Sequence, residues 1–214
     1  MASEPRELML EPRELMLERL QMNERDTPGR LARYLARLTE LTGGEPTVQE
    51  VAAPGAEQGR VLAVSFADTP EPGCLTAFSY GLSLADRSDP DSAGRELVLT
   101  GRTDDPGWAT VPATVVAALR GRCPFDHGQA IGSARRLVPS TDLNSLVVAE
   151  PVIGGGSESI RLDLSDPDTA QADPVEILGV YPVFDYEREY VTEHGFEALW
   201  SFDWDRLDLR RARA

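Results

Sequence analysis

The sequence predicts a single α+β domain in which helices flank a mixed, mostly antiparallel sheet. Three observations lead to this class. The 214 residues are 41% hydrophobic and 27% charged, which are ordinary globular values and enough chain to bury a core. The predicted elements follow the order helix, strands, helix, strands, helix. Because strands and helices do not alternate regularly, a doubly wound nucleotide-binding sheet is disfavoured.

The first helix is predicted after Thr27 and Pro28, a capping residue followed by a first-turn proline. Apolar side chains then recur at helical spacing as far as Leu41, and Gly43 ends the helix. The preceding residues 1–26 contain the heptapeptide EPRELML twice in tandem. We expect this N-terminal extension to be poorly ordered or loosely docked, with a partner-binding helix as the alternative.

Strands and a second helix follow. Four apolar or alternating runs, separated by turns rich in Pro, Gly and Asp, predict an antiparallel meander over residues 48–51, 60–66, 74–80 and 95–99. A helix is predicted from Pro112 to about Gly121. Three further runs predict strands over residues 145–149, 159–164 and 175–183, before a closing helix over 185–200 capped by Asp185. We place the domain at residues 27–205, with a tail over 206–214.

The charge of the chain is strongly negative. The 36 acidic residues face 21 arginines and no lysine, which gives a formal net charge of -15 at pH 7. This charge opposes attraction to nucleic-acid phosphates and to anionic lipid, and it favours a basic protein as partner. The sequence shows neither a signal-peptide pattern nor an apolar run of about 18 residues. We therefore predict a cytoplasmic protein that contacts neither nucleic acid nor membrane.

Patterns for catalysis and metal binding are weak. Cys74 and Cys123 form no CxxC motif, and His127 and His194 belong to neither an HExxH motif nor a cluster with metal spacing. A thiol, a carboxylate and an imidazole do occur together in CPFDH, but catalytic triads are not generally assembled from five consecutive residues. We predict no enzymatic activity, no metal and no cofactor. A cysteine hydrolase that uses Cys123 with His127 or an Asp pair is the least favoured alternative.

Two other motifs are interpreted as turns. The run GGGS at residues 154–157 lacks the lysine and the following helix of a phosphate-binding loop, so we expect a hairpin turn. The acidic stretch Asp163, Asp166, Asp168 and Asp173 lacks the glycine and the closing glutamate of a calcium loop. We expect these carboxylates to be hydrated.

Acidic residues concentrate towards the end of the sequence. Residues 162–208 contain thirteen Asp and Glu but two Arg, and three aromatic residues alternate with acids in WSFDWD. Aromatic anchors within an acidic rim suit a basic protein partner. The alternative is that the aromatic rings cover the core while the acids keep the surface soluble. The candidate partner-binding residues are Asp166, Asp168, Asp203, Trp204, Asp205 and Asp208.

Five segments resemble the suppressor of fused family in their order and spacing. They are CLTAFSYGLSLAD at 74–86, RELVLTGR at 95–102, WATVPATVVAALRGRCPFDHGQAI at 108–131, LNSLVVAEP at 143–151 and VEILGVYPVFDYEREYVTEHGFEALW at 175–200. Together they span about residues 45–200 and correspond to the N-terminal domain of the animal members. The C-terminal domain that helps those members hold a transcription-factor peptide has no counterpart here, so that partner is not transferred.

The resemblance implies a single mixed α+β domain that is not an enzyme and works by protein–protein contact. Single-domain bacterial members resemble immunity proteins, which bind and neutralise a toxin domain, and the use of arginine without lysine fits a GC-rich bacterial coding bias. The alternative is a regulatory adaptor that adds an extended peptide to a sheet edge. The partner's identity and the oligomeric state are left open.

Overall fold

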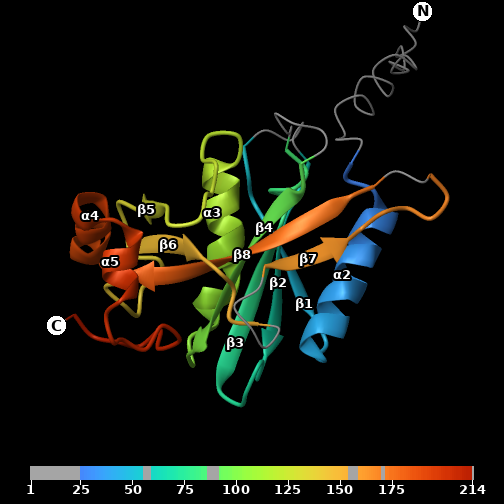
Figure 1. Ribbon diagram of the computed structural model, residues 1–214. Helices are drawn as coiled ribbons and strands as arrows, with labels where there is room; N and C mark the ends of the chain where they lie inside the picture. Colours follow the sequence, from blue (N-terminus) through green and yellow to red (C-terminus); the bar gives the residue numbers. More distant parts are fainter. Residues whose placement is uncertain (1–24, 55–58, 86–91, 154–158, 170–171, 214) are drawn as a thin grey trace, which may run out of the picture.

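An eight-stranded sheet forms the centre of the computed structural model, which describes residues 25–54, 59–85, 92–153, 159–169 and 172–213 (Figure 1). The strand order is β1-β2-β3-β4-β8-β6-β5, and β7 pairs with β8 beside β6. The strands are β1 Thr47–Val51, β2 Val61–Ala67, β3 Cys74–Tyr80, β4 Gly94–Arg102, β5 Ala130–Gly132, β6 Ser145–Ala149, β7 Ile160–Asp163 and β8 Pro174–Val183.

Four α-helices and one 3-10 helix flank this sheet in the described part of the chain. They are α2 Pro28–Thr42, η2 Pro106–Thr110, α3 Val111–Leu119, α4 Asp185–His194 and α5 Phe196–Trp200. Helix α2 begins as predicted, because the Thr27 hydroxyl accepts a hydrogen bond from the Arg30 amide at 3.1 Å. It ends at Gly43, whose φ of 71° places it in the left-handed conformation that favours glycine.

The predicted meander is confirmed, since β1 to β4 pair antiparallel in sequence order. Strand β8 then pairs parallel to β4, which makes the sheet mixed. This parallel pairing ends at Val98 and Gly179, although β4 continues to Arg102. The two halves of the sheet therefore separate along the last residues of β4.

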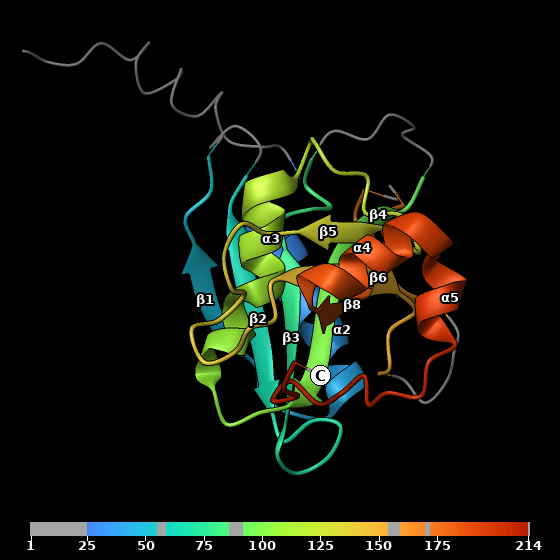
Figure 2. The same ribbon diagram turned by 90° about the vertical axis from the view of Figure 1, so that its left-hand side faces the viewer.

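The two faces of the sheet carry separate hydrophobic cores. On one face, η2 and α3 pack Trp108 and Val116 against strand residues such as Leu97 and Leu99. On the other face, α2 packs Tyr34 and other apolar residues against β2, β3 and β8. Figure 2 shows α3 and α2 on opposite sides of the strands. The predicted class, an α+β domain with a mostly antiparallel sheet and flanking helices, is confirmed.

The closing helix differs from its prediction in two ways. It is divided into α4 and α5 by Gly195, whose φ of 87° and ψ of 162° are accessible to glycine and not to ordinary side chains. Asp185 is not the capping residue either. Phe184 occupies that position, and its amide donates to the Glu187 carboxylate at 2.7 Å. Asp185 instead forms an ion pair with Arg213 at 3.0 Å.

Two predictions lie largely or wholly outside the described residues. The N-terminal extension over residues 1–26 is described only at Arg25 and Asp26, where the Asp26 carboxylate lies 3.0 Å from Arg60. The predicted hairpin turn at residues 154–157 is not described at all. Strand β5, by contrast, is described and was not predicted. No helix in the described ranges is both long and apolar enough to cross a membrane.

Candidate functional site

The predicted partner-binding residues fall at two ends of the molecule. Asp203, Trp204, Asp205 and Asp208 follow α5, whereas Asp166 and Asp168 lie in the connection from β7 to β8, close to α2. Figure 1 shows α4 and α5 at the opposite end of the sheet from α2 and this connection. The structure therefore does not join the six residues into one surface.

At the α2 end, the acidic residues have partners within the fold. Asp166 forms a half-exposed ion pair with Arg33 at 3.4 Å and also accepts from the Asp168 amide at 2.9 Å. Asp173 forms an ion pair with the buried Arg30 at 2.7 Å. Asp163 accepts from the Ser165 hydroxyl and amide, and these hydrogen bonds lower the pKa of its carboxyl group. Among the described residues, no group of three His, Cys, Asp or Glu is placed to hold a metal ion.

The side chains of the CPFDH segment face different neighbours. The Cys123 thiol lies 3.6 Å from the Gln129 amide oxygen, and Asp126 forms an ion pair with Arg95 at 2.9 Å. The His127 ring stands edge-on to Phe196, with 4.9 Å between ring centroids. The loop thus has a packed thiol, and its carboxylate and imidazole are each engaged elsewhere.

The most completely buried carboxylate, that of Glu96 on β4, belongs to the scaffold. It accepts hydrogen bonds from the hydroxyl groups of Ser79 and Ser83 at 2.6 and 2.7 Å. The backbone amides of Gly81 and Ser83 donate to it at 2.8 and 3.0 Å. All these donors come from the chain itself, and the residue is 0% exposed, so the cluster has a structural role.

An exposed aromatic surface lies at the other end, on α4 and α5. Phe202 is 48% exposed and its ring contacts Tyr190, with centroids 5.1 Å apart. Tyr190 also stacks on His194 at 4.3 Å. Exposed carboxylates occur on the same two helices and just after them, at Glu193, Glu197 and Asp203. We call this surface the end face; it comprises Tyr190, Glu193, His194, Glu197, Phe202 and Asp203.

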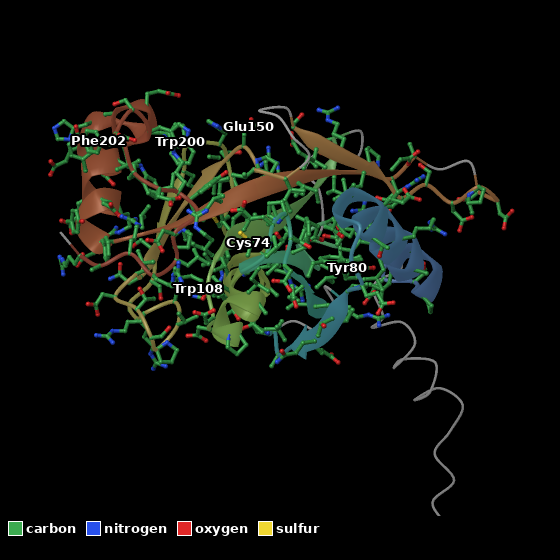
Figure 3. All side chains as sticks on the ribbon, turned by 90° about the horizontal axis from the view of Figure 1, so that it is seen from below. Cys74, Tyr80, Trp108, Glu150, Trp200 and Phe202 are labelled. Atoms are coloured by element: carbon green, nitrogen blue, oxygen red, sulfur yellow. The ribbon has the colours of Figure 1, made fainter. Side chains whose placement is uncertain are left out.

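Figure 3 shows where the end face lies relative to the cores. Phe202 and Trp200 are at the extremity of the molecule formed by α4 and α5, whereas Tyr80 lies near α2 and Trp108 near α3. Trp200 packs inward, because its ring contacts Tyr181 at 4.9 Å. Of the aromatic residues that the sequence singled out, Phe202 is therefore the one that faces outward.

The residues after Trp204 form a segment that the sequence did not assign to the site. Residues 205–213, which we call the C-terminal arm, run back across the end of the sheet. The Arg102 amide donates to the Leu207 carbonyl at 2.7 Å, Arg102 and Asp208 form a parallel β-bridge, and Leu209 is 2% exposed. The arm thus packs on β4 and supplies a side chain to the core.

Arginines of the arm contact aromatic rings and carboxylates of the neighbouring residues. Arg206 lies 4.3 Å from the Trp200 ring and donates to the Trp200 carbonyl at 2.5 Å. Arg211 lies 4.5 Å from the Trp204 ring and makes two hydrogen bonds of 2.6 Å to Glu187. Trp204 is half-buried, and a second guanidinium group of its own chain, that of Arg206, lies 5.7 Å from its ring.

Two predicted acids are engaged by this arrangement. Asp205 forms an ion pair with Arg102, and Asp208 lies 3.7 Å from Arg210. Burial alone would raise the pKa of Asp205, but hydrogen bonds from the Leu207 amide and from Arg102 lower it overall. Asp203, which is exposed, remains on the end face. The available signal for the arm in the sequence was the pair of leucines followed by three arginines in LDLRRAR.

The described residues thus define an α+β domain with a mixed, mostly antiparallel sheet and flanking helices, and its α4–α5 end carries an exposed aromatic ring and exposed carboxylates. The sequence profile described as suppressor of fused protein (SUFU) matches residues 57–212. The chain belongs to the suppressor of fused family.

Solved structures of this family share the fold. A suppressor of fused homologue from Neisseria gonorrhoeae is 16% identical, with a TM-score of 0.58 over 86% of this chain and 93% of that chain. The structure of a Sufu–Fu complex is 16% identical, with a TM-score of 0.57 over 81% of this chain and 82% of the other. Drosophila Suppressor of Fused is 15% identical, with a TM-score of 0.52 over 87% of this chain and 51% of that one. Curated protein sequences contain no match to this chain.

Proposed function

We propose that this chain is a non-enzymatic protein-binding domain of the immunity type, which binds a cognate basic toxin domain through its end face and neutralises it. The observation that carries the proposal is the exposed Phe202 ring beside Tyr190, at an end of the molecule where Glu193, Glu197 and Asp203 are also exposed. Apolar anchors of this kind hold a complex, whereas the surrounding charges steer the partner into place.

The charge of the chain supports a basic partner. The net charge of -15 attracts cationic proteins over distances of about a Debye length, and it repels nucleic acid and anionic lipid. Many toxin domains that act on nucleic acid carry basic surfaces, because those surfaces bind phosphate. An acidic domain that covers such a surface blocks the toxin's access to its substrate.

Affinity capture with the full chain as bait tests this proposal. We expect a lysate of the source cells to yield one basic protein in equal proportion, released by high salt and identified by mass spectrometry. When produced alone, that protein should arrest growth, and co-production of this chain should restore it. If the captured protein does not affect growth, the immunity function is wrong, although a binding function would stand.

The end face should govern the rate of association with the captured protein. Replacing Glu193→Gln, Glu197→Gln and Asp203→Asn together is expected to lower the association rate constant about tenfold at low salt, with a smaller difference at high salt. Stopped-flow or biosensor kinetics would measure this. Phe202→Ala should instead raise the dissociation rate, since it removes an anchor and no charge.

A matched set of substitutions separates the effect of where the removed charges lie from the effect of the change in net charge. Glu40→Gln, Glu45→Gln and Glu50→Gln remove three exposed charges from α2, β1 and the connection between them, away from the end face (Figure 1). Asp166→Asn with Asp168→Asn tests the other end of the molecule. If either set slows association as much as the end-face set does, the end face is not the binding surface.

A second candidate function is a regulatory adaptor that binds an extended peptide by strand addition. The observation that favours it is the separated edge of β4, where the Arg102 amide pairs with the Leu207 carbonyl of the arm and not with β8. The Arg102 amide at this edge already bonds to a carbonyl outside the named strands, and a carbonyl of a peptide can take the same place.

A further inference from the structure

We propose that a cavity just beyond the end of β4 binds an arginine side chain of the basic protein partner. The inference rests on the proposed function in that it gives this partner a second contact, at a place different from the end face. The cavity has a volume of about 440 Å³ and lies between three segments that are far apart in the sequence: residues 103–106 with Trp108, then Ser140, then Leu209 and Arg210 of the arm. This volume is within the range of about 300 to 1,000 Å³ that is usual for ligand pockets.

Three of the residues that line the cavity are apolar. Trp108 and Leu209 are 1% and 2% exposed, because both also belong to the core that η2 and α3 form with the sheet. Pro106, which is exposed, is the third. Long cationic side chains lay their aliphatic stems along apolar surface of this kind while the charged end stays at the polar rim. The cavity therefore suits an amphipathic ligand.

Asp105 supplies a carboxylate that is held in place by the fold. It accepts hydrogen bonds from the Ser140 hydroxyl and, at 2.8 Å, from the Gly107 amide. The Asp105 amide in turn donates to the Thr103 hydroxyl at 3.0 Å. The hydrogen bond from Ser140, followed by that from Gly107, lowers the pKa of the Asp105 carboxyl group, so the group is ionised at neutral pH. A ligand thus meets a negative charge whose position is already fixed, which reduces the ordering cost of binding.

A second carboxylate, that of Asp104, is available to a ligand. Its side chain is 94% exposed, and its ion-pair partner in the described part of the chain is Arg210 at 3.9 Å, which is too long for a hydrogen bond. Arg210 also lies 3.7 Å from Asp208, and its side chain is 59% exposed. Around the cavity, the carboxylates of Asp104, Asp105 and Asp208 outnumber the single guanidinium of Arg210. The local charge is therefore negative and favours a cation.

Arginine fits this lining better than lysine does. Its guanidinium group carries five N–H donors and is more weakly hydrated than an ammonium group. It can therefore donate to more than one carboxylate while its flat face rests on apolar side chains, at a lower cost of dehydration. Arginines of the chain itself show this behaviour, since Arg206 lies 4.3 Å from the Trp200 ring and donates to the Trp200 carbonyl. Arginine is also enriched at protein-binding surfaces.

The cavity is separate from the end face but is connected to it along the chain. Figure 3 shows Trp108 near α3, whereas Phe202 lies at the extremity formed by α4 and α5. The arm joins the two places, because it begins shortly after Asp203 and its residues Leu209 and Arg210 line the cavity. A partner that lies over the arm can thus contact both the end face and the cavity.

The test uses the full chain and small probes in place of the unidentified partner. The probes are N-acetylarginine methylamide and its citrulline counterpart, which has nearly the same shape and no charge. Heteronuclear NMR spectra would follow the Trp108 indole N–H and the amides of Asp104 and Arg210 during titration. We expect the arginine probe to shift these signals saturably, with a dissociation constant of the order of a millimolar. It should bind at least about tenfold more tightly than the citrulline probe.

Two exposed positions should change the affinity for the arginine probe in opposite directions. Asp104→Asn removes the available carboxylate and should weaken binding at least about fivefold. Arg210→Gln removes the like charge and leaves Asp104 without its ion pair, so it should tighten binding about threefold. Glu40→Gln is the matched control: it removes from α2 an exposed carboxylate that is also paired with an arginine, and it should leave the affinity unchanged.

The opposite results would overturn the proposal. If the arginine probe causes no saturable shift, the cavity does not bind arginine. If the citrulline probe binds as tightly, or if Arg210→Gln weakens binding of the arginine probe, the carboxylates do not recognise the cation. A native circular dichroism spectrum for each variant excludes unfolding as the cause. Because the probes replace the partner, their failure leaves the capture experiment and the end-face kinetics untouched, and a failure of those leaves probe binding untouched.

Discussion

Replacing Glu96 by alanine is expected to lower the free energy of unfolding by at least about 3 kcal/mol, because a buried charged acceptor is removed from several donors at once. The Glu96 carboxylate is enclosed by Ser79, Gly81, Leu82 and Ser83, with donor distances from 2.6 to 3.3 Å. Without it, two hydroxyl groups and three backbone amides lose their acceptor in a site that water does not reach. The turn after β3 should then lose its conformation.

Urea unfolding followed by circular dichroism would measure this effect. Glu96→Gln should be less destabilising than Glu96→Ala, since one oxygen acceptor remains, although its NH₂ group then faces the donors. Glu50→Gln is the matched control on the exposed edge strand β1 and should change stability by no more than about 0.5 kcal/mol. A loss of less than about 1 kcal/mol in Glu96→Ala would show that the carboxylate does not hold the turn.

The hydrogen bonds to Glu96 also give a structural reason for the SYGLS motif at residues 79–83. The SYGLS segment resembled the family, and the structure shows that its two serines and its glycine serve as donors to Glu96. The signal for such a site was an acidic residue within the apolar run of β4. Sequence periodicity could place both strands, but the contact joins residues 13 to 17 positions apart and depends on the register between β3 and β4.

The elements that were predicted well have strong local signals. Helix α2 has a capping threonine, a first-turn proline and a terminal glycine, and its bounds matched the prediction closely. Strand β5 has three residues, and its strand conformation comes from pairing with β6, which no local pattern encodes. Gly195 divides the predicted closing helix into α4 and α5. A glycine in a helical pattern can weaken or bend the helix as well as end it, so the tertiary fold decides which of these occurs.

The sequence indicated which types of residue to consider for the candidate site, but it did not indicate how the fold arranges them. Alternating aromatic and acidic residues pointed to the end of the molecule at which Phe202 and Asp203 are exposed. The same pattern predicted that Trp204 and Asp205 contact a partner, whereas in the structure they contact arginines of the same chain. The predicted tail over 206–214 supplies Arg211 beside Trp204, whereas β4 supplies Arg102 beside Asp205. Their effect could not be anticipated, because it depends on the arm folding back over β4 and α4.

Raising the pH above about 10 is expected to unfold the protein cooperatively before pH 12, because three tyrosines are buried as neutral phenols. Burial raises the pKa of Tyr80 to about 12, although Arg30 beside it acts in the opposite direction. Burial likewise raises the pKa of Tyr34 well above its usual value, and it raises that of Tyr181. Between pH 10 and the raised pKa, the folded chain keeps these protons while the unfolded chain releases them.

The sign of the effect follows from this difference in proton binding. The stability that the neutral phenols contribute is complete below about pH 10 and is lost as the pH rises towards the folded pKa. Each tyrosine lowers the free energy of unfolding by about 1.4 kcal/mol per pH unit in that window, so three lower it by about 4 kcal/mol per unit. The chain has no lysine, and the tyrosines and two cysteines therefore dominate titration in this range.

Urea midpoints measured from pH 8 to pH 11.5, together with the near-ultraviolet absorbance of tyrosinate, would check this prediction. Tyr34→Phe loses the 2.7 Å hydrogen bond to the Ser79 carbonyl and should be less stable at neutral pH by about 1 kcal/mol. Its stability should nevertheless decline less steeply above pH 10, by about one third, because one titrating group is gone. Tyr186→Phe, at a ring that is 37% exposed, is the matched control and should retain the steep decline of the unaltered chain. A stability that stays constant up to pH 11.5 would mean that these tyrosines reach solvent, contrary to the two cores described above.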